Sequence, residues 1–298
     1  MKVFERLDHS VTFSSEERML IDAVRVLARE QIAPRAATYD RSGEFPWDNV
    51  KAINALGLNA MFVPEAYSGA QLSYAAYLEC VREISKACAS TGVIWATNFH
   101  AMKPLVDWGN EEQKKRLLPK VAAGALASLV ITEPTAGSDA TGMKTSFKLD
   151  GDSIVVNGSK TFITNGVHAD LLLVFGKWTE IEDSKASISV LVMEKGTPGL
   201  KVVREEDKMG LRASSTATLA FDNCRVPRAN LLCNPGDGLK ILLASLNKSR
   251  PSVAAHALGI ARGAFEDAVN YINERKQSGR KIVEFQFNQI IAAHNNST

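Results

Sequence analysis

The feature that most constrains the fold is a change in hydrophobic period along the chain. From Phe13 to about Ala125, apolar side chains recur at intervals of three and four, which is the period of a helix. From about Leu126 to Leu232 they alternate with a period of two, and from about Gly238 the helical spacing returns. Closely spaced short strands without intervening helices are typical of a sandwich or barrel, not of a doubly wound sheet. We therefore predict an α+β multidomain fold in which a β domain lies between two helical ones in the sequence.

The first stretch predicts a series of helices. Ser14 and Glu17 are spaced as a capping box ahead of an apolar stripe, and Pro34 is expected to close that helix. Further helical patterns run over residues 49–56, 74–87, 92–106 and 111–121, and residues 61–73 are rich in turn formers. This part of the chain is therefore expected to be helical apart from one linker.

The middle stretch predicts strands. Asp150-Gly151-Asp152 between two alternating runs is the strongest short hairpin signal in the sequence, because this composition suits a tight turn. Its strands are predicted at 144–149 and 153–156, and others at 169–175, 188–193, 200–204 and 217–221.

The last stretch predicts a helix with a kink or break at Pro251 and a second helix that begins at Val283. The apolar stripes of such a pair need further helices to cover them, so this unit is expected to be incomplete. Gly236-Asp237-Gly238 mimics the start of a dinucleotide fingerprint but lacks the third glycine, and it is better interpreted as a helix N-terminus.

Composition excludes several classes of protein. Lys+Arg 35 against Asp+Glu 33 gives a net charge of +2, without the one-sided basic surface that nucleic acid or anionic membrane requires. Glu5 and Asp8 occupy the place where a signal peptide needs an apolar core, and no apolar run is long enough for a membrane span. We expect an intracellular protein, cytoplasmic if bacterial or in the mitochondrial matrix if eukaryotic. No metal site is expected, because the five histidines form no H-E-x-x-H and the four cysteines, expected to be reduced, form no C-x-x-C.

Two segments carry the pattern of a ligand site. The run Leu126–Ile131 delivers Thr132 and then a turn with Pro134, Gly137 and Ser138-Asp139, which places hydroxyls and backbone N–H groups at a strand end. Such a turn can bind a carbonyl-rich or phosphorylated ligand, although taken alone it is also compatible with a plain loop. A second segment, NGSKTFITNG, sets an aromatic residue and a hydroxyl on a short strand between two glycine-bearing turns.

Four segments in register resemble the acyl-CoA dehydrogenase family over nearly the whole chain. They are TEPTAGSD, NGSKTFITNG, KMGLRASSTATLAFDNCRVP, and ALGIA followed by YINERKQSGRKIVEFQ. The resemblance implies an N-terminal α-helical domain at 1–125, a central β-barrel at 126–235 and an incomplete C-terminal helical-bundle domain at 236–298. It further implies FAD as cofactor, α,β-dehydrogenation of an acyl-CoA thioester, electron transfer to an electron-transferring flavoprotein, and a homodimer or homotetramer.

The resemblance also implies roles for individual residues. Ser138 would lie near both cofactor and acyl-CoA, and Phe162 would cover the flavin where many relatives have Trp. Arg275 would reach the FAD pyrophosphate of a neighbouring subunit, since a guanidinium matches paired phosphate oxygens; the alternative is an exposed arginine at a helix end. The other implied cofactor contacts are Leu129, Val130, Ile131, Thr132, Ile163, Thr164, Gln277, Phe285 and Gln286, and the acyl-CoA contacts are Asn247 and Arg250.

One departure from the family pattern concerns the base that removes the α proton. Most members carry this Glu in a Y-E-G-T-like segment that is not found here, and the alternative position is occupied by Ser249. The catalytic residue is therefore unknown. A fragment, a non-catalytic acyl-CoA- or flavin-binding or assembly protein, and an oxidase that reacts with dioxygen all remain as alternatives.

Overall fold

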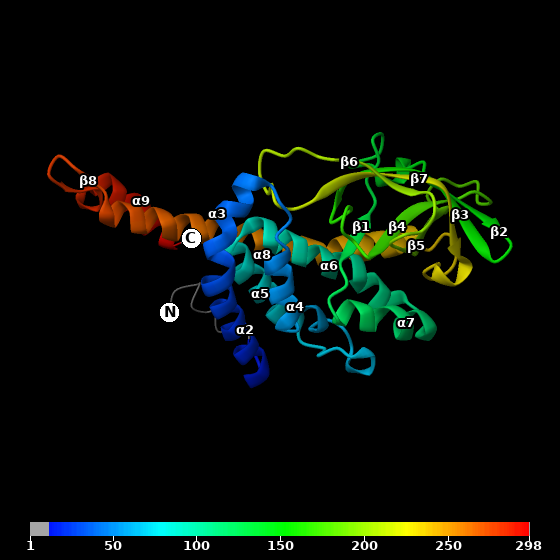
Figure 1. The fold of residues 1–298 in the computed structure, drawn as a ribbon, viewed down its shortest axis with the longest axis horizontal. Coiled ribbons are helices and arrows are strands. Elements are labelled where there is room, and N and C mark those ends of the chain that lie inside the picture. The colour runs from blue at the N-terminus through cyan, green and yellow to red at the C-terminus, as the bar shows by residue number, and fades with distance from the viewer. Residues whose placement is uncertain (1–11, 298) are drawn as a thin grey trace.

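A computed structural model describes residues 12–297, so Glu5 and Asp8 lie outside the described residues. A helical body occupies the middle of the molecule, a curled β sheet covers one end, and a helical arm extends from the opposite end (Figure 1). The long helix α8 (Gly238–Glu274) runs through all three parts. The predicted α+β fold class, with helical regions before and after the sheet, is confirmed.

The N-terminal helices begin with the predicted capping box, in which the Ser14 hydroxyl accepts from Glu17 N–H and the Glu17 carboxylate accepts from Ser14 N–H. Pro34 does not close this helix, contrary to the prediction. It falls in the first turn of α3, where a proline N–H would be unpaired anyway, and a π-helical turn joins that helix to the preceding one. The helical elements are α2 (Ser15–Leu27), η1 (Ala28–Ile32), α3 (Ala33–Ser42), α4 (Trp47–Ala55), η2 (Leu58–Ala60), η3 (Glu65–Tyr67), α5 (Tyr74–Ala87), α6 (Ala89–Trp108) and α7 (Glu111–Ala122).

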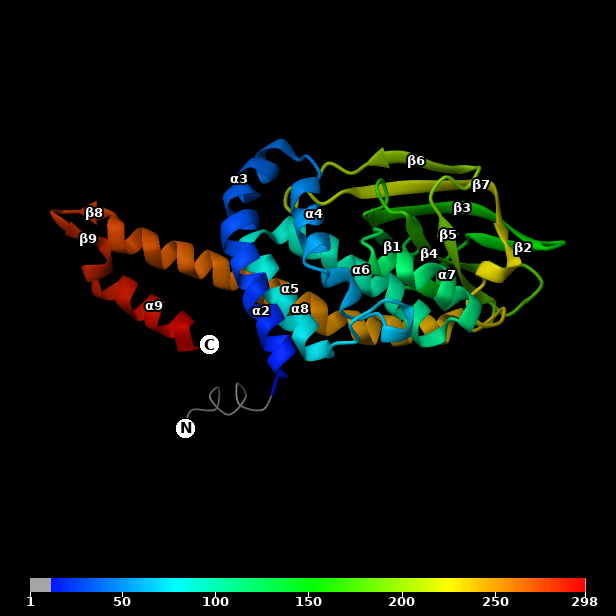
Figure 2. The same cartoon turned by 60° about the horizontal axis from the view of Figure 1, so that its bottom comes forward.

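The sheet curls around its own apolar core in the order β1-β4-β2-β3-β7-β6, with β5 paired to β4 (Figure 2). Its strands are β1 (Ala127–Val130), β2 (Ser146–Asp150), β3 (Ser153–Thr164), β4 (Leu171–Trp178), β5 (Ile188–Glu194), β6 (Leu200–Glu205) and β7 (Thr216–Pro227). The predicted β2–β3 hairpin is confirmed, with Asp150 opposite Ser153. The turn predicted at Gly158 is wrong, because β3 continues through it. Gly158 adopts φ +147° at an irregularity in the β3–β7 pairing, and a Cβ there would lie 2.6 Å from the Thr145 hydroxyl.

A kink or a break was predicted at Pro251, and a break is wrong because α8 continues through this residue. Pro251 is exposed, so water can satisfy the carbonyl that its missing N–H leaves free. Gly259 and Gly263 let α8 approach α5, because a Cβ at these positions would lie 2.3 Å from Arg82 O and 2.6 Å from Lys86 O. Beyond α8 the arm consists of β8 (Lys276–Gln277), β9 (Arg280–Lys281), η6 (Ile282–Glu284) and α9 (Gln286–Ser297), so the last helix begins three residues later than predicted.

No helix within residues 12–297 combines the length and the apolar character that crossing a bilayer demands. The described cysteines are unpaired thiols, and no cluster of metal-ligating side chains is found in the same part of the chain.

Candidate functional site

The ends of β1 and β3 meet although the two strands are not neighbours in the sheet. Thr161 N–H donates to Thr132 O at 2.9 Å, and the Ser128 hydroxyl donates to Thr164 O. We call residues 127–133 and 160–165 the β1–β3 closure. It brings the two segments that the sequence singled out, SLVITEPT and KTFIT, side by side at one edge of the β domain.

A buried ion pair ties the closure together. Lys160 Nζ lies 2.9 Å from Glu133 Oε1 and donates to Ile131 O at 2.7 Å, and both charged side chains are almost completely buried. Glu133 also accepts the backbone N–H groups of Lys144 and Thr145, at 2.6 and 2.9 Å. The pair therefore fixes the loop after β1 to β3 and to the residues directly before β2.

The protonation of this pair follows from its surroundings. Burial lowers the pKa of Lys160 to about 8 against the opposing effect of Glu133, so the ammonium is the main form at neutral pH. Burial alone would raise the pKa of Glu133, but Lys160 and the hydrogen bonds from Thr145 and Lys144 hold it below its ordinary value. Both groups are therefore charged at pH 7.

Asn165 joins the closure to the helical body. Its side-chain amide donates to Ile94 O on α6 at 3.0 Å and to Ala127 O on β1 at 3.2 Å, and its backbone N–H donates to Ser215 O at 2.9 Å. These bonds tie Asn165, the residue directly after Thr164, to α6, to β1 and to the residue before β7.

Phe162 projects out of the closure from a strained backbone. Its φ is +58°, its side chain is 64% exposed, and its neighbours Thr161 and Ile163 are buried. The β3–β7 register shifts between Lys160 and Ile163, so a bulge re-aims the aromatic ring outward. A large aromatic held in this way can cover one face of a flat ring system.

The other predicted flavin contacts divide into two groups. Val130 and Ile163 point into the core of the β domain, so only their backbone atoms can face a ligand. Leu129 and Ile131 are partly buried against the helical core, whereas Thr132 and Thr164 are partly exposed. The side-chain hydrogen bonds found in the closure within residues 12–297 are made by Ser128, Lys160, Thr161, Glu133 and Asn165, which leaves the hydroxyls of Thr132 and Thr164 available to a ligand.

Ser138 lies outside the closure, in the exposed turn that follows Ala136. Glu133 and Ala136 bond each other through both backbone pairs, at 3.0 and 3.1 Å, which closes the start of this turn. The side chain of Asp139 then accepts from Thr141 N–H at 3.1 Å.

The arm carries the predicted residues that lie farthest from the closure (Figure 2). Arg275, Gln277 and Gln286 are exposed, and the Arg280 guanidinium lies 4.1 Å from the centre of the Phe285 ring. The structure does not bring these residues to the closure of the same chain.

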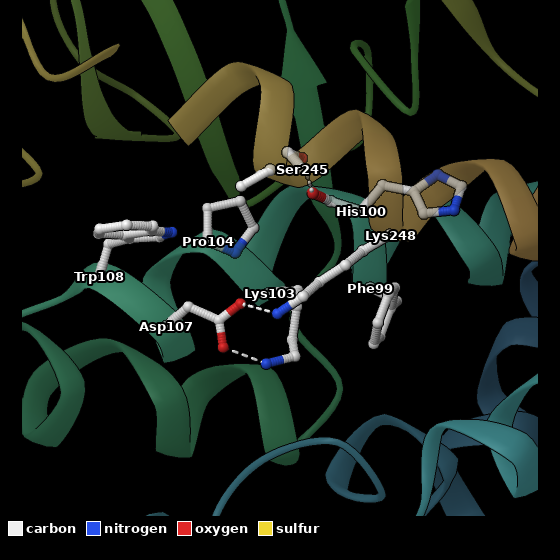
Figure 3. Close-up of a pocket in the computed structure, with 9 residues that line it drawn as sticks. Phe99, His100, Lys103, Pro104, Asp107, Trp108, Ser245 and Lys248 are labelled. Carbon is white, nitrogen blue, oxygen red and sulfur yellow. Dashed lines mark hydrogen bonds and ion pairs between the residues drawn. The ribbon is translucent and has the colours of Figure 1, made fainter. Parts of the chain in front are cut away.

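The helix α8 carries the predicted acyl-CoA contacts. Asn247 and Arg250 are exposed and joined by a hydrogen bond of 3.0 Å, whereas Ser249 is buried and donates to Leu246 O at 3.1 Å. A narrow pocket between α6 and α8 is lined by Ala244, Ser245 and Lys248 of the same helix, and Figure 3 shows Asp107 bound there by the ammonium groups of Lys103 and Lys248.

His100 lines the same pocket. Its Nε2 is buried and has no hydrogen-bond partner among the residues that the structure describes. Burial and the nearby His256 lower the pKa of His100 to about 4, so its ring is neutral at pH 7.

Glu133, Lys160 and Asn165 were not predicted from the sequence as site residues. A signal for Lys160 was available, because counting by twos from Ile154 and Val156 places its side chain on the inner face of β3. A charged residue at an inward position needs a partner of opposite charge, and that requirement could have drawn attention to Glu133.

Comparison with known proteins gives consistent matches over the chain. Models of the acyl-CoA dehydrogenase N-terminal, middle and C-terminal domains match residues 14–125, 128–224 and 236–294. An acyl-CoA dehydrogenase of Bacillus subtilis (strain 168) is 41% identical over 275 residues, which cover 92% of this chain and 72% of the relative.

Solved structures also match the chain over most of its length. A chain in the structure described as the electron transferring flavoprotein of Acidaminococcus fermentans has a TM-score of 0.92 and 37% identity, covering 95% of this chain and 75% of that one. A glutaryl-CoA dehydrogenase from Mycobacterium smegmatis in complex with FADH2 has a TM-score of 0.86 and 28% identity, covering 94% and 71%.

Proposed function

The chain belongs to the acyl-CoA dehydrogenase family of oxidoreductases, and we propose that it binds FAD and dehydrogenates an acyl-CoA thioester between its α and β carbons. In this proposal the electrons pass to an electron-transferring flavoprotein. The observation that carries the proposal is the closure, where Phe162 is turned outward between strand ends that also carry the partly exposed Thr132 and Thr164.

The residues of the closure fit a flavin. Phe162 offers an apolar plane, and the hydroxyls and N–H groups around Thr132 and Thr164 offer donors to the carbonyl-rich edge of the ring system. When bound, FAD supplies the acceptor for the hydride that leaves the β carbon. The closure's share of the chemistry is to orient the ring, to cover one face and to exclude water from that face.

The arm supports a contact with a second copy of the chain. Arg275 can pair two phosphate oxygens, and Gln277 and Gln286 add further polar groups on the same arm. Because these residues lie on the arm, at the end of the molecule opposite the sheet, we propose that they reach the cofactor of a neighbouring subunit in a homodimer or homotetramer.

For the acyl-CoA we propose Asn247 and Arg250 on α8, with Ser138 contacting both substrate and cofactor. The side chains of all three residues are exposed and polar, as contacts to a nucleotide-bearing thioester would be. They would bind and orient the substrate, and none of them is assigned the removal of the α proton.

A test of the reaction is anaerobic bleaching of the FAD-loaded protein by saturated acyl-CoA thioesters of several chain lengths. Bleaching by any of them supports dehydrogenation, and flavin binding without bleaching supports the alternative of a non-catalytic acyl-CoA- or flavin-binding protein. Ser249→Glu is the informative variant, because it supplies a carboxylate on α8 and is expected to accelerate bleaching by about 10²- to 10⁴-fold if only the base is lacking.

A further inference from the structure

The peptide bond between Ile131 and Thr132 is fixed by the buried ion pair. Its carbonyl accepts the Lys160 ammonium at 2.7 Å, and the next carbonyl, that of Thr132, accepts Thr161 N–H at 2.9 Å. Because a trans peptide is planar, its N–H points opposite to its carbonyl. The Thr132 N–H is therefore directed away from Lys160, and within residues 12–297 it has no hydrogen-bond partner.

The charge on Lys160 also polarises the peptide bond that it contacts. A hydrogen bond from an ammonium is short and strong, and it polarises the peptide that accepts it, which strengthens the N–H at the other end as a donor. Glu133 holds Lys160 in place, and its own position is set by the N–H groups of Lys144 and Thr145.

We propose that Lys160 is a positioning residue for the flavin, which aims and polarises the Thr132 N–H so that it binds the electron-rich edge of the isoalloxazine ring. The inference rests on the proposed binding of FAD at the closure. A donor strengthened in this way favours the reduced flavin over the oxidised one, because reduction places more negative charge on the ring.

The alternative is that Lys160 only balances the buried charge of Glu133. The double variant E133Q/K160M separates the two roles, because it removes both charges and leaves no unpaired ion. Thr91→Val is the matched control, since it deletes a buried hydrogen bond of 2.9 Å to Asn49 in the helical body, away from the closure.

We expect E133Q/K160M to remain folded in urea titrations and to bind oxidised FAD about 10-fold more weakly than wild type, as for the loss of one charge-assisted hydrogen bond. Reduced FAD should lose about tenfold more affinity than oxidised FAD, which lowers the two-electron midpoint potential by about 30 mV. Thr91→Val should change the urea midpoint, but it should change neither the affinity for FAD nor the midpoint potential. Wild-type affinity and potential in the folded double variant would overturn the inference while leaving the proposed function intact.

A second measurement uses the wild-type protein and does not depend on a folded variant. In threonine-labelled protein, the amide proton of Thr132 should move on addition of FAD, and that of Thr161, already bonded to Thr132 O, should move much less. If the amide proton signal of Thr132 does not move in FAD-loaded protein, this inference is overturned and the proposed function is not. A wild-type chain that takes up no FAD overturns the proposed function and this inference together.

Discussion

The β1–β3 closure and the arm both resemble cofactor-binding segments, but the chain supports them in opposite ways. In the closure, Lys160 on β3 and Glu133 are buried and bonded to each other, and they also bond the segment that follows β1 and the segment that precedes β2. In the arm, Arg275 is exposed and α9 leaves Phe287 72% and Ile290 60% exposed. The closure is therefore organised by bonds within its own chain, whereas the arm leaves apolar side chains uncovered that a second copy would cover in the proposed oligomer.

The largest expected effect is in the closure. Glu133→Ala should lower the free energy of unfolding by about 3 to 5 kcal/mol, because it leaves the Lys160 charge buried and unpaired. Urea unfolding followed by circular dichroism measures this. Glu194→Ala is the control, since it breaks half-exposed pairs with Arg116 and Lys120 and should cost about 1 kcal/mol or less. Equal losses in the two variants would mean that the closure is not the rigid region.

The second expected effect is a pH dependence of the free energy of unfolding, which arises from His100 on α6 in the helical body. His100 has a folded-state pKa of about 4, below its ordinary 6.5, so between these values the unfolded chain binds a proton that the folded chain does not. The contribution of His100 to the free energy of unfolding is therefore fully present above pH 6.5. It falls by up to about 3 kcal/mol as the pH drops towards 4. His100→Leu should flatten the dependence between these two pH values, and a profile parallel to that of wild type would contradict the assignment.

A smaller effect is expected when the free hydroxyls of the closure are removed. Thr132→Val and Thr164→Val should each weaken FAD retention by about 2- to 10-fold, the value of one hydrogen bond, with little change in unfolding. Flavin absorbance after extensive dialysis is the measurement. A double variant that keeps its full flavin content would show that these hydroxyls do not contact the cofactor.

The smallest effect on the fold is expected in the arm. Arg275→Lys keeps the charge but loses the two-pronged hydrogen bonding, so it should change the free energy of unfolding by less than about 0.5 kcal/mol. FAD content and dimer formation should nevertheless fall together, because ligand binding and assembly are linked. Sedimentation that shows a stable dimer with unchanged FAD content would contradict this linkage between FAD binding and assembly.

Local signals predicted much of this architecture. The capping box at Ser14 and the hairpin at Gly151 each depend on a few adjacent residues, and both are confirmed. The continuation of β3 through Gly158 and the bulge that turns Phe162 outward depend on pairing with β7, about sixty residues away, which a local pattern does not contain. The strand period places Lys160 on the inner face of β3, but it does not identify the partner, because the ion pair with Glu133 forms only when the sheet closes.

The most direct test of the account mixes two defective chains. A Thr132→Val/Thr164→Val chain is defective in its closure, and an Arg275→Ala chain is defective in its arm. If each FAD site combines the closure of one chain with the arm of another, mixed dimers regain one intact site, so an equimolar mixture should recover FAD in about one quarter of all sites by the symmetry of the pair. No recovery above the two separate variants, in a mixture shown to contain mixed dimers, would contradict the account.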